Sequence, residues 1–208
     1  AEALHWPSPS GRRGRTATAS MAEARTRQTA TLLPSGKVLV IGGYDSTGST
    51  TFSQTAEMYD PALGTWTAMA TQLASARGQH AAQLLPGGNA VLLIGGVNRT
   101  GFVDTAELFP VNGSGSTTVL PGTVPGGNVY TSVLLDDGSV LAMCDRSNTA
   151  LRFHPDTSSW TTSTFSATRS LPTMTTLSDG RVLLAGGVGG GGVRLTTADI
   201  YNPDSNVW

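Results

Sequence analysis

Residue types that commonly carry out catalysis are few in this chain and lie far apart in the sequence. The histidines are His5, His80 and His154, and the single cysteine is Cys144. No His-x3-His, Cys-x2-Cys or carboxylate-rich motif is present, so a metal site would need ligands gathered from distant segments. A lone cysteine cannot form an internal disulfide and ordinarily serves as a small buried hydrophobe. We therefore predict no catalytic residue, no metal and no cofactor.

Arginines and acids do recur at matching positions. Four segments of the chain resemble one another and can be aligned on Gly36, Gly88, Gly138 and Gly180. Three of these four copies carry an arginine eleven residues before the glycine and an acid on a later segment. The pairs are Arg25 with Glu57, Arg77 with Glu107, and Arg169 with Asp199. The third copy has lost both partners, which fits a buried charge-assisted bond, because one unpaired charge would be costly. We expect these pairs to be structural; ligand binding by the arginines is the alternative.

The aligned glycines belong to a unit that is repeated at intervals of 52, 50 and 42 residues. In each copy an apolar segment and a glycine turn precede a short apolar run, at 38–41, 91–94, 140–143 and 182–185. Such runs are typical of strands that are buried on both faces, and the glycine suits a hairpin turn with positive φ. Paired glycines end three of these runs, at 42–43, 95–96 and 186–187, where we expect that a Cβ would clash with neighbouring backbone.

A third segment of the form Ala-acid-apolar-aromatic follows, and then a segment that begins near Trp66, Trp160 or Trp208. The second copy has no tryptophan at this point. With the paired glycines, this register resembles the kelch repeat of β-propellers, in particular that of exported bacterial kelch-repeat proteins. The resemblance covers about residues 15–208. It implies an all-β propeller of about four blades, each with four antiparallel strands, and a function in binding proteins or glycans.

The expected organisation is an irregular tail over 1–14 and a propeller over 15–208, with blades at about 22–70, 71–121, 122–165 and 166–208. Residues 15–21 are expected to form an outer strand. This strand would either complete the last blade and close the ring, or end a preceding blade of a longer array. Four blades are at the low end of the propeller range of about four to eight. The ring is therefore partial, or is completed by a second copy through the open blade faces.

Binding residues on such a scaffold are expected in the loops, because the strands are committed to packing. The loops between second and third strands and those between blades emerge on the same face of a propeller. We expect a binding face there, although any of these residues could simply be solvated. The candidates are Tyr44, Asp45, Phe52, Asn98, Arg99, Phe102, Asp104, Asp145, Arg146 and Arg194.

The composition excludes some classes of partner. Of 208 residues 13% are charged, against about 25% in an average domain, and the formal net charge is −1. No overall field would attract nucleic acid, and no apolar run approaches the length of a membrane span. A surface rich in glycine, serine and threonine favours an extracellular or cell-surface location.

We expect a non-enzymatic binding or scaffold module that presents its loop face to a protein or glycan, with self-association or a larger assembly as a further expectation. The first alternative, implied by the resemblance alone, is a sugar- or alcohol-oxidising enzyme of the kelch-propeller oxidase type. That chemistry needs histidines and a Cys–Tyr crosslink, for which Cys144 with Tyr130 or Tyr44 would be the candidates. The second alternative is a purely structural subunit of a ring or filament.

Overall fold

The computed structural model describes residues 18–45, 51–122, 124 and 128–208. Within these ranges the chain is all-β: it contains strands and one short 3₁₀ turn, η1 (Gly190–Gly192), but no α-helix. No helix in this part of the chain has the length and apolar character needed to cross a membrane.

The strands form blades in which neighbours in sequence pair antiparallel. Blade 1 contains β1 (Thr29–Leu32), β2 (Val38–Ile41), β5 (Ala56–Asp60) and β6 (Thr65–Ala68). Blade 2 contains β7 (Ala81–Leu84), β8 (Ala90–Ile94), β11 (Ala106–Pro110) and β12 (Thr118–Val119). Blade 3 contains β13 (Val129–Leu134), β14 (Val140–Cys144), β15 (Ser147–His154) and β16 (Ser159–Arg169). Blade 4 contains β17 (Thr173–Thr176), β18 (Val182–Ala185) and β19 (Ala198–Tyr201).

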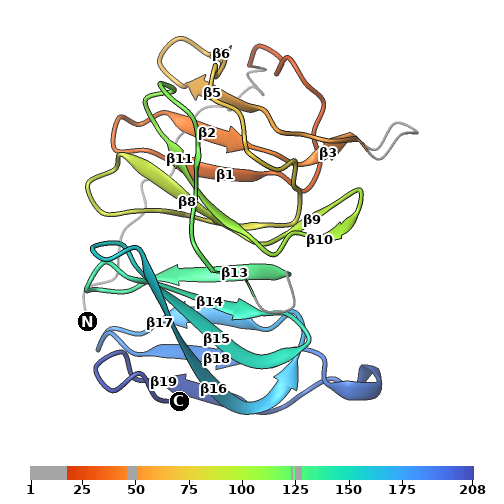
Figure 1. Cartoon of the computed structure of the whole chain (residues 1–208), viewed down its shortest axis with the longest axis vertical. Helices are drawn as coiled ribbons and strands as arrows, with labels where there is room; N and C mark the ends of the chain where they lie inside the picture. Colours follow the sequence, from red (N-terminus) through yellow and green to blue (C-terminus); the bar gives the residue numbers. More distant parts are fainter. Residues whose placement is uncertain (1–17, 46–50, 123, 125–127) are drawn as a thin grey trace, which may run out of the picture.

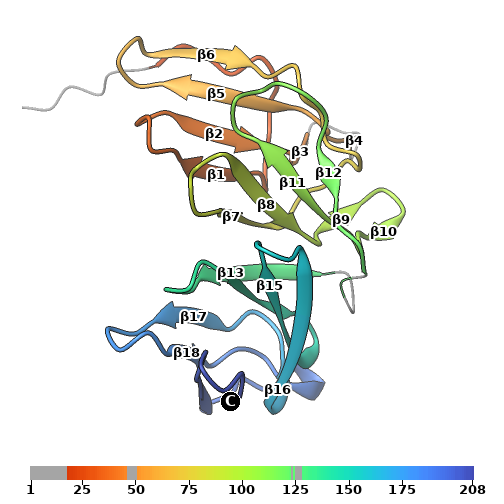
Figure 2. The same cartoon turned by 60° about the vertical axis from the view of Figure 1, so that its left-hand side comes forward.

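The blades follow one another in sequence order along the long axis of the molecule (Figure 1). Turning the molecule shows β1, β7, β13 and β17 stacked in that order, with blades 1 and 4 at opposite ends of the row (Figure 2). The predicted fold class, an all-β protein with blades of the β-propeller type, is confirmed.

The second strand of each blade is apolar throughout because both of its faces pack on a neighbour. In β8, Val91 and Leu93 join a core shared with blade 1, whereas Leu92 and Ile94 join a core shared with blade 3. A third core lies between blades 3 and 4. Since side chains of a strand alternate between its faces, a continuous apolar run is what two interfaces require.

Short hairpins extend the connection between second and third strands. They are formed by β3 (Tyr44–Asp45) with β4 (Thr51–Phe52), and by β9 (Val97–Asn98) with β10 (Gly101–Phe102). Blade 4 has η1 at this place, and blade 3 has a tight turn at Asp145–Arg146. These segments emerge along one edge of the row, at the right in Figure 1, which we call the loop face. The opposite edge, which carries the turns between first and second strands, is the turn face.

Two expectations about boundaries differ from the structure. Thr18–Met21, the described part of the expected outer strand over 15–21, forms no strand and lies beside blade 1, where the Ala19 N–H donates to the Gly64 carbonyl oxygen at 3.1 Å. Residues 15–17, like the tail over 1–14, lie outside the described residues. In addition, β16 continues to Arg169, beyond the expected end of blade 3 at 165, because the end of β16 pairs with Ser147 at the start of β15.

The paired glycines lie where backbones from adjacent blade segments meet. A Cβ on Gly96 would come within 2.7 Å of the Gly78 carbonyl oxygen, and one on Gly43 within 2.8 Å of the Thr26 carbonyl oxygen. Both glycines also have positive φ, of 99° and 92°. The predicted crowding is therefore present, and glycine is required for close approach as well as for conformation.

We expect Gly96→Ala to lower the free energy of unfolding by about 3 kcal/mol or more, from positive-φ strain together with the clash. Gly36→Ala is the matched control: Gly36 also has positive φ, but open space surrounds its Cβ position. Strain alone should make that loss about 1 kcal/mol. Urea unfolding followed by tryptophan fluorescence measures both. Equal losses would contradict the crowding.

Candidate binding face

The loop face is supported from below by a buried arginine in blade 2. Arg77 precedes β7, and its Nη1 donates to the carbonyl oxygens of Gly95 and Thr105, at 2.9 and 2.8 Å. Its Nη2 donates to Glu107 Oε1 at 2.5 Å, and neither side chain is exposed. Gly95 ends the second-strand segment and Thr105 begins the third. The guanidinium therefore fixes the two roots of the β9–β10 hairpin.

The same arrangement occurs in two other blades, and we call it the arginine clamp. Its members are Arg25, Gly42, Thr55 and Glu57 in blade 1, and Arg169, Gly186, Thr197 and Asp199 in blade 4. Arg25 Nη2 lies 3.2 Å from Glu57 Oε1, and Arg169 Nη2 lies 2.5 Å from Asp199 Oδ2. The structure thus brings together each of the three pairs that the register predicts.

The carboxylate of each clamp also accepts hydrogen bonds from the backbone just before the clamp arginine. Glu107 accepts the backbone N–H of Ala74 at 2.8 Å and that of Ser75 at 3.3 Å. Glu57 accepts the N–H of Ala22 at 2.7 Å in the same way. The clamp consequently joins three stretches of backbone, and hydrogen bonds to charged groups are among the stronger ones in proteins.

Blade 3 replaces the clamp with a smaller polar cluster. Asn128 and Asp145 are both buried, and Asn128 Nδ2 donates to Asp145 Oδ2 at 3.5 Å and to the Tyr130 hydroxyl. The Oδ1 atoms of both residues have no hydrogen-bond partner in the described part of the chain. Asp145, expected on the binding face, is therefore a buried residue, because the turn has only two residues and Asp145 directly follows the buried strand β14. Gly127, the residue at the arginine position, lies outside the described residues.

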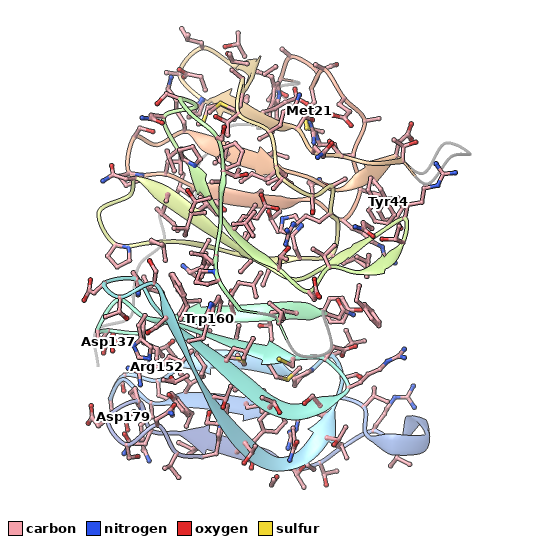
Figure 3. All side chains as sticks on the ribbon, in the orientation of Figure 1. Met21, Tyr44, Asp137, Arg152, Trp160 and Asp179 are labelled. Atoms are coloured by element: carbon pink, nitrogen blue, oxygen red, sulfur yellow. The ribbon has the colours of Figure 1, made fainter. Side chains whose placement is uncertain are left out.

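The other candidates lie on the loop face. Tyr44 and Phe52 pair across the β3–β4 hairpin with ring centroids 5.2 Å apart, and Tyr44 marks this edge in Figure 3. Asn98, Arg99 and Phe102 belong to the β9–β10 hairpin. Asp45 lies in β3, Asp104 is exposed after β10, and Arg194 is exposed where it bridges to Val188.

Two clefts open between adjacent loops. The first, of about 220 Å³, lies between the β3–β4 and β9–β10 hairpins and is lined by Thr51, Phe52, Ala76, Asn98, Arg99 and Thr100. Its Asn98 Oδ1 accepts the Thr100 N–H at 2.9 Å and hydroxyl at 2.8 Å, which fixes the turn that carries Arg99. The second, of about 460 Å³, lies between blades 3 and 4 and is lined by Arg146, Thr168, Ser170, Leu171, Val188 and Gly189–Gly192.

The repeat that builds this face matches a known family. Residues 25–72, which run from the clamp arginine of blade 1 to just beyond β6, match the model of the Kelch motif. The chain therefore contains a kelch repeat. No curated protein matches the chain. Kelch repeats generally mediate protein interactions, and the motif indicates a β-propeller of the protein-binding or scaffold type.

Three further residues of the loop face were not predicted from the sequence. Arg27, Gln79 and Leu171 each lie two residues after a clamp arginine and have φ between 51° and 56°. Positive φ is uncommon for residues other than glycine and is often found at functional sites. Their shared position, two residues after the clamp arginine, is a feature of the sequence that could have identified them. Residue type gave none, because arginine, glutamine and leucine do not favour this conformation.

Charge is separated between the two faces of the kelch array. Exposed arginines on the loop face are Arg27, Arg99, Arg146 and Arg194, and the exposed acid Asp104 lies on the same face. Arg146 Nε lies 3.8 Å from Oδ2 of the buried Asp145. Exposed acids on the turn face are Asp136, Asp137, Asp156, Asp179 and Asp204. The labels Asp137 and Asp179 lie at the edge opposite Tyr44 in Figure 3. Cations there are mostly paired: Arg181 with Asp179 at 2.7 Å, Lys37 with Asp60 at 3.0 Å, and the buried Arg152 with Asp137 at 2.5 Å. A net charge near zero therefore conceals a basic and an acidic face.

The residue types that commonly bind metals or act as nucleophiles are dispersed or buried in the core. Among the described residues, no group of three or more His, Cys, Asp or Glu side chains could hold a metal ion. Cys144 is buried between blades 2 and 3, and burial raises the pKa of its thiol to about 12. The thiol is therefore protonated at neutral pH, a form with little nucleophilic reactivity.

His80 is buried between blades 1 and 2. Its Nε2 lies 2.9 Å from Thr29 Oγ1, and its Nδ1 has no hydrogen-bond partner within the described ranges. Burial, with a further contribution from the positive charge of Arg77, lowers the pKa of His80 from 6.5 to about 3. The imidazole is thus neutral in the folded protein at every pH near neutrality.

The clamp predicts strong coupling between its members. Arg77→Met or Glu107→Leu alone should lower the free energy of unfolding by about 3–5 kcal/mol, because each leaves a buried charge without its partner. The double variant should lose about 2 kcal/mol less than the sum of the single losses. Urea unfolding of the four proteins gives the coupling.

The exposed pair Arg181 and Asp179 is the control for this cycle, and it should show little coupling. Additive losses at Arg77 and Glu107 would contradict a structural clamp and would favour a ligand-binding role for the arginine.

His80 predicts a pH dependence of stability. Since its folded pKa is depressed, its neutral form favours folding fully above pH 6.5, and this contribution is lost as the pH falls from 6.5 towards 3. The loss should be about 2 kcal/mol between pH 7.5 and 5. In His80→Gln, which copies Gln28 at the same position of blade 1, this part of the pH dependence should be absent. Identical pH profiles for the two proteins would contradict the account.

Proposed function

We propose that this chain binds an acidic segment of a protein partner through its loop face. The observation that carries the proposal is the concentration of exposed arginines beside two clefts on that face, while most of the exposed carboxylates lie on the opposite face. Complementary charge steers a partner to one face and disfavours the other.

Each cleft offers a cation and an apolar surface side by side. In the first, Arg99 lies next to Phe52 and forms no ion pair within the part of the chain that the structure describes. In the second, Arg146 and Leu171 line the same cleft; Leu171 is 64% exposed, and Arg146 is exposed although its Nε lies 3.8 Å from Asp145 Oδ2. Arginine and large apolar side chains are typical of the residues that dominate protein interfaces. An extended partner segment with acidic and apolar side chains would satisfy both.

Because the clamps already hold the loops in place, the loops should lose little conformational entropy when a partner binds. The roots of the β3–β4 and β9–β10 hairpins are held by Arg25 and Arg77, so the cleft between them is present before a partner arrives. A preorganised surface loses less conformational entropy on binding. A neutral glycan is the less favoured ligand, because it would not use the charge of this face.

We expect peptides selected from a random phage-displayed library on the immobilised chain to be rich in Asp, Glu and apolar residues. Arg99→Ser and Arg146→Ser should each weaken the best peptide by about tenfold, since each removes one cation of the face. Affinity should also fall as salt is raised, because exposed charges are screened. Fluorescence anisotropy of the labelled peptide measures these changes.

Arg181→Ser, on the turn face, is the matched control and should bind the peptide like the wild type. Selection of neutral or basic peptides, or of peptides that bind Arg99→Ser and Arg146→Ser without loss, would overturn the proposal. Binding of a neutral oligosaccharide at these clefts in place of peptides would also overturn it.

A further inference from the structure

Each blade carries the same apolar set on the side that faces the next blade; we call this side the trailing face. The set combines two residues of the second strand with facing residues of the third. Its members are Leu39, Ile41, Ala56 and Met58 in blade 1, Leu92, Ile94, Ala106 and Leu108 in blade 2, and Leu141, Met143 and Ala150 in blade 3. All of these lie in a core shared with the following blade.

Blade 4 carries the set as well, but no described blade covers it. The residues are Leu183, Ala185, Ala198 and Ile200, and the pairing is Leu183 with Ile200 and Ala185 with Ala198. Ile200 is 42% exposed, and Leu183 is only half-buried. By contrast, Leu39, Ile41 and Ala56 of blade 1 are fully buried.

The other side of each blade, the leading face, carries a valine and an aromatic residue in one row across the sheet. The pairs are Val91 with Phe109, Val140 with Phe153, and Val182 with Tyr201, and all six side chains are fully buried against the preceding blade. Blades 3 and 4 add a tryptophan, Trp160 or Trp208, whose ring contacts that aromatic residue at 4.9 or 5.2 Å.

Blade 1 has the same row, and no described blade lies over it. Val38 pairs with Tyr59, and Tyr59 stacks on Trp66 at 4.9 Å, yet all three are only half-buried. Leu32, which extends the row, is 68% exposed. Within the described residues, one trailing face and one leading face are therefore left uncovered, and they are the two complementary halves of an interface that the blades already form three times.

We propose that the trailing face of blade 4 docks on the leading face of blade 1 in a second copy of this chain. The contact is head-to-tail and continues the blade-on-blade stacking from one copy into the next. A trailing face does not fit another trailing face in this way, because the aromatic row is present on leading faces alone. The inference is independent of the proposed function, since it uses the ends of the row and not the loop face.

The test is the solution mass of the 208-residue chain by size-exclusion chromatography with light scattering, over a range of concentrations. The wild type should show masses of two or more chains, above the 21.4 kDa of one. Ile200→Lys and Leu32→Lys each place a charge in one half of the interface, so each variant alone should remain at 21.4 kDa. A mixture of the two should form dimers, because one junction then joins two native faces.

Leu63→Lys is the matched control: Leu63 is 74% exposed in the turn between β5 and β6, away from both faces, and its variant should associate like the wild type. Circular dichroism of every variant should match that of the wild type. A wild type that stays at 21.4 kDa would overturn the proposal, as would association that survives both face variants. A mixture that stays monomeric would also overturn it, since the contact would then not be head-to-tail.

Discussion

The structure depends on a guanidinium that is buried beneath a loop. In each of three blades, one arginine meets two carbonyl oxygens that end the second strand and begin the third, and a carboxylate completes its set of acceptors. A buried charge is stable only when it is paired and hydrogen-bonded. The loop roots must therefore stay together for the arginine to be tolerated, and the arginine in turn fixes the loop roots.

This constraint separates two populations of arginine with different roles. Arg25, Arg77 and Arg169 are buried by the repeat and leave no charge for a ligand. Arginines such as Arg99 and Arg146 project from the loops that the clamps hold, and they give the loop face its positive character. A charge count over the whole chain conceals this, because most of the exposed acids lie on the turn face.

Much of the fold follows from the sequence because its signals are local and repeated. Apolar runs bounded by glycine predict the second strands, and the matching positions of Arg77 and Glu107 predict their contact. Where the structure differs, distant contacts decide the outcome. Asp145 is buried because the turn of blade 3 is short, and Thr18–Met21, expected to belong to an outer strand, lies beside blade 1 without pairing as a strand. The positive φ of Leu171 has no signature in residue type.

The most direct test of the account is nuclear magnetic resonance of the arginine side chains, which reports rotation about the Cζ–Nε bond and exchange of the guanidinium protons with water. Rotation and exchange should be slow for Arg25, Arg77 and Arg169, because acceptors fixed in the fold hold their nitrogens. Both should be rapid for Arg99 and Arg146. Rapid averaging at the three buried arginines would contradict the clamp, and with it the explanation of how the loop face is positioned.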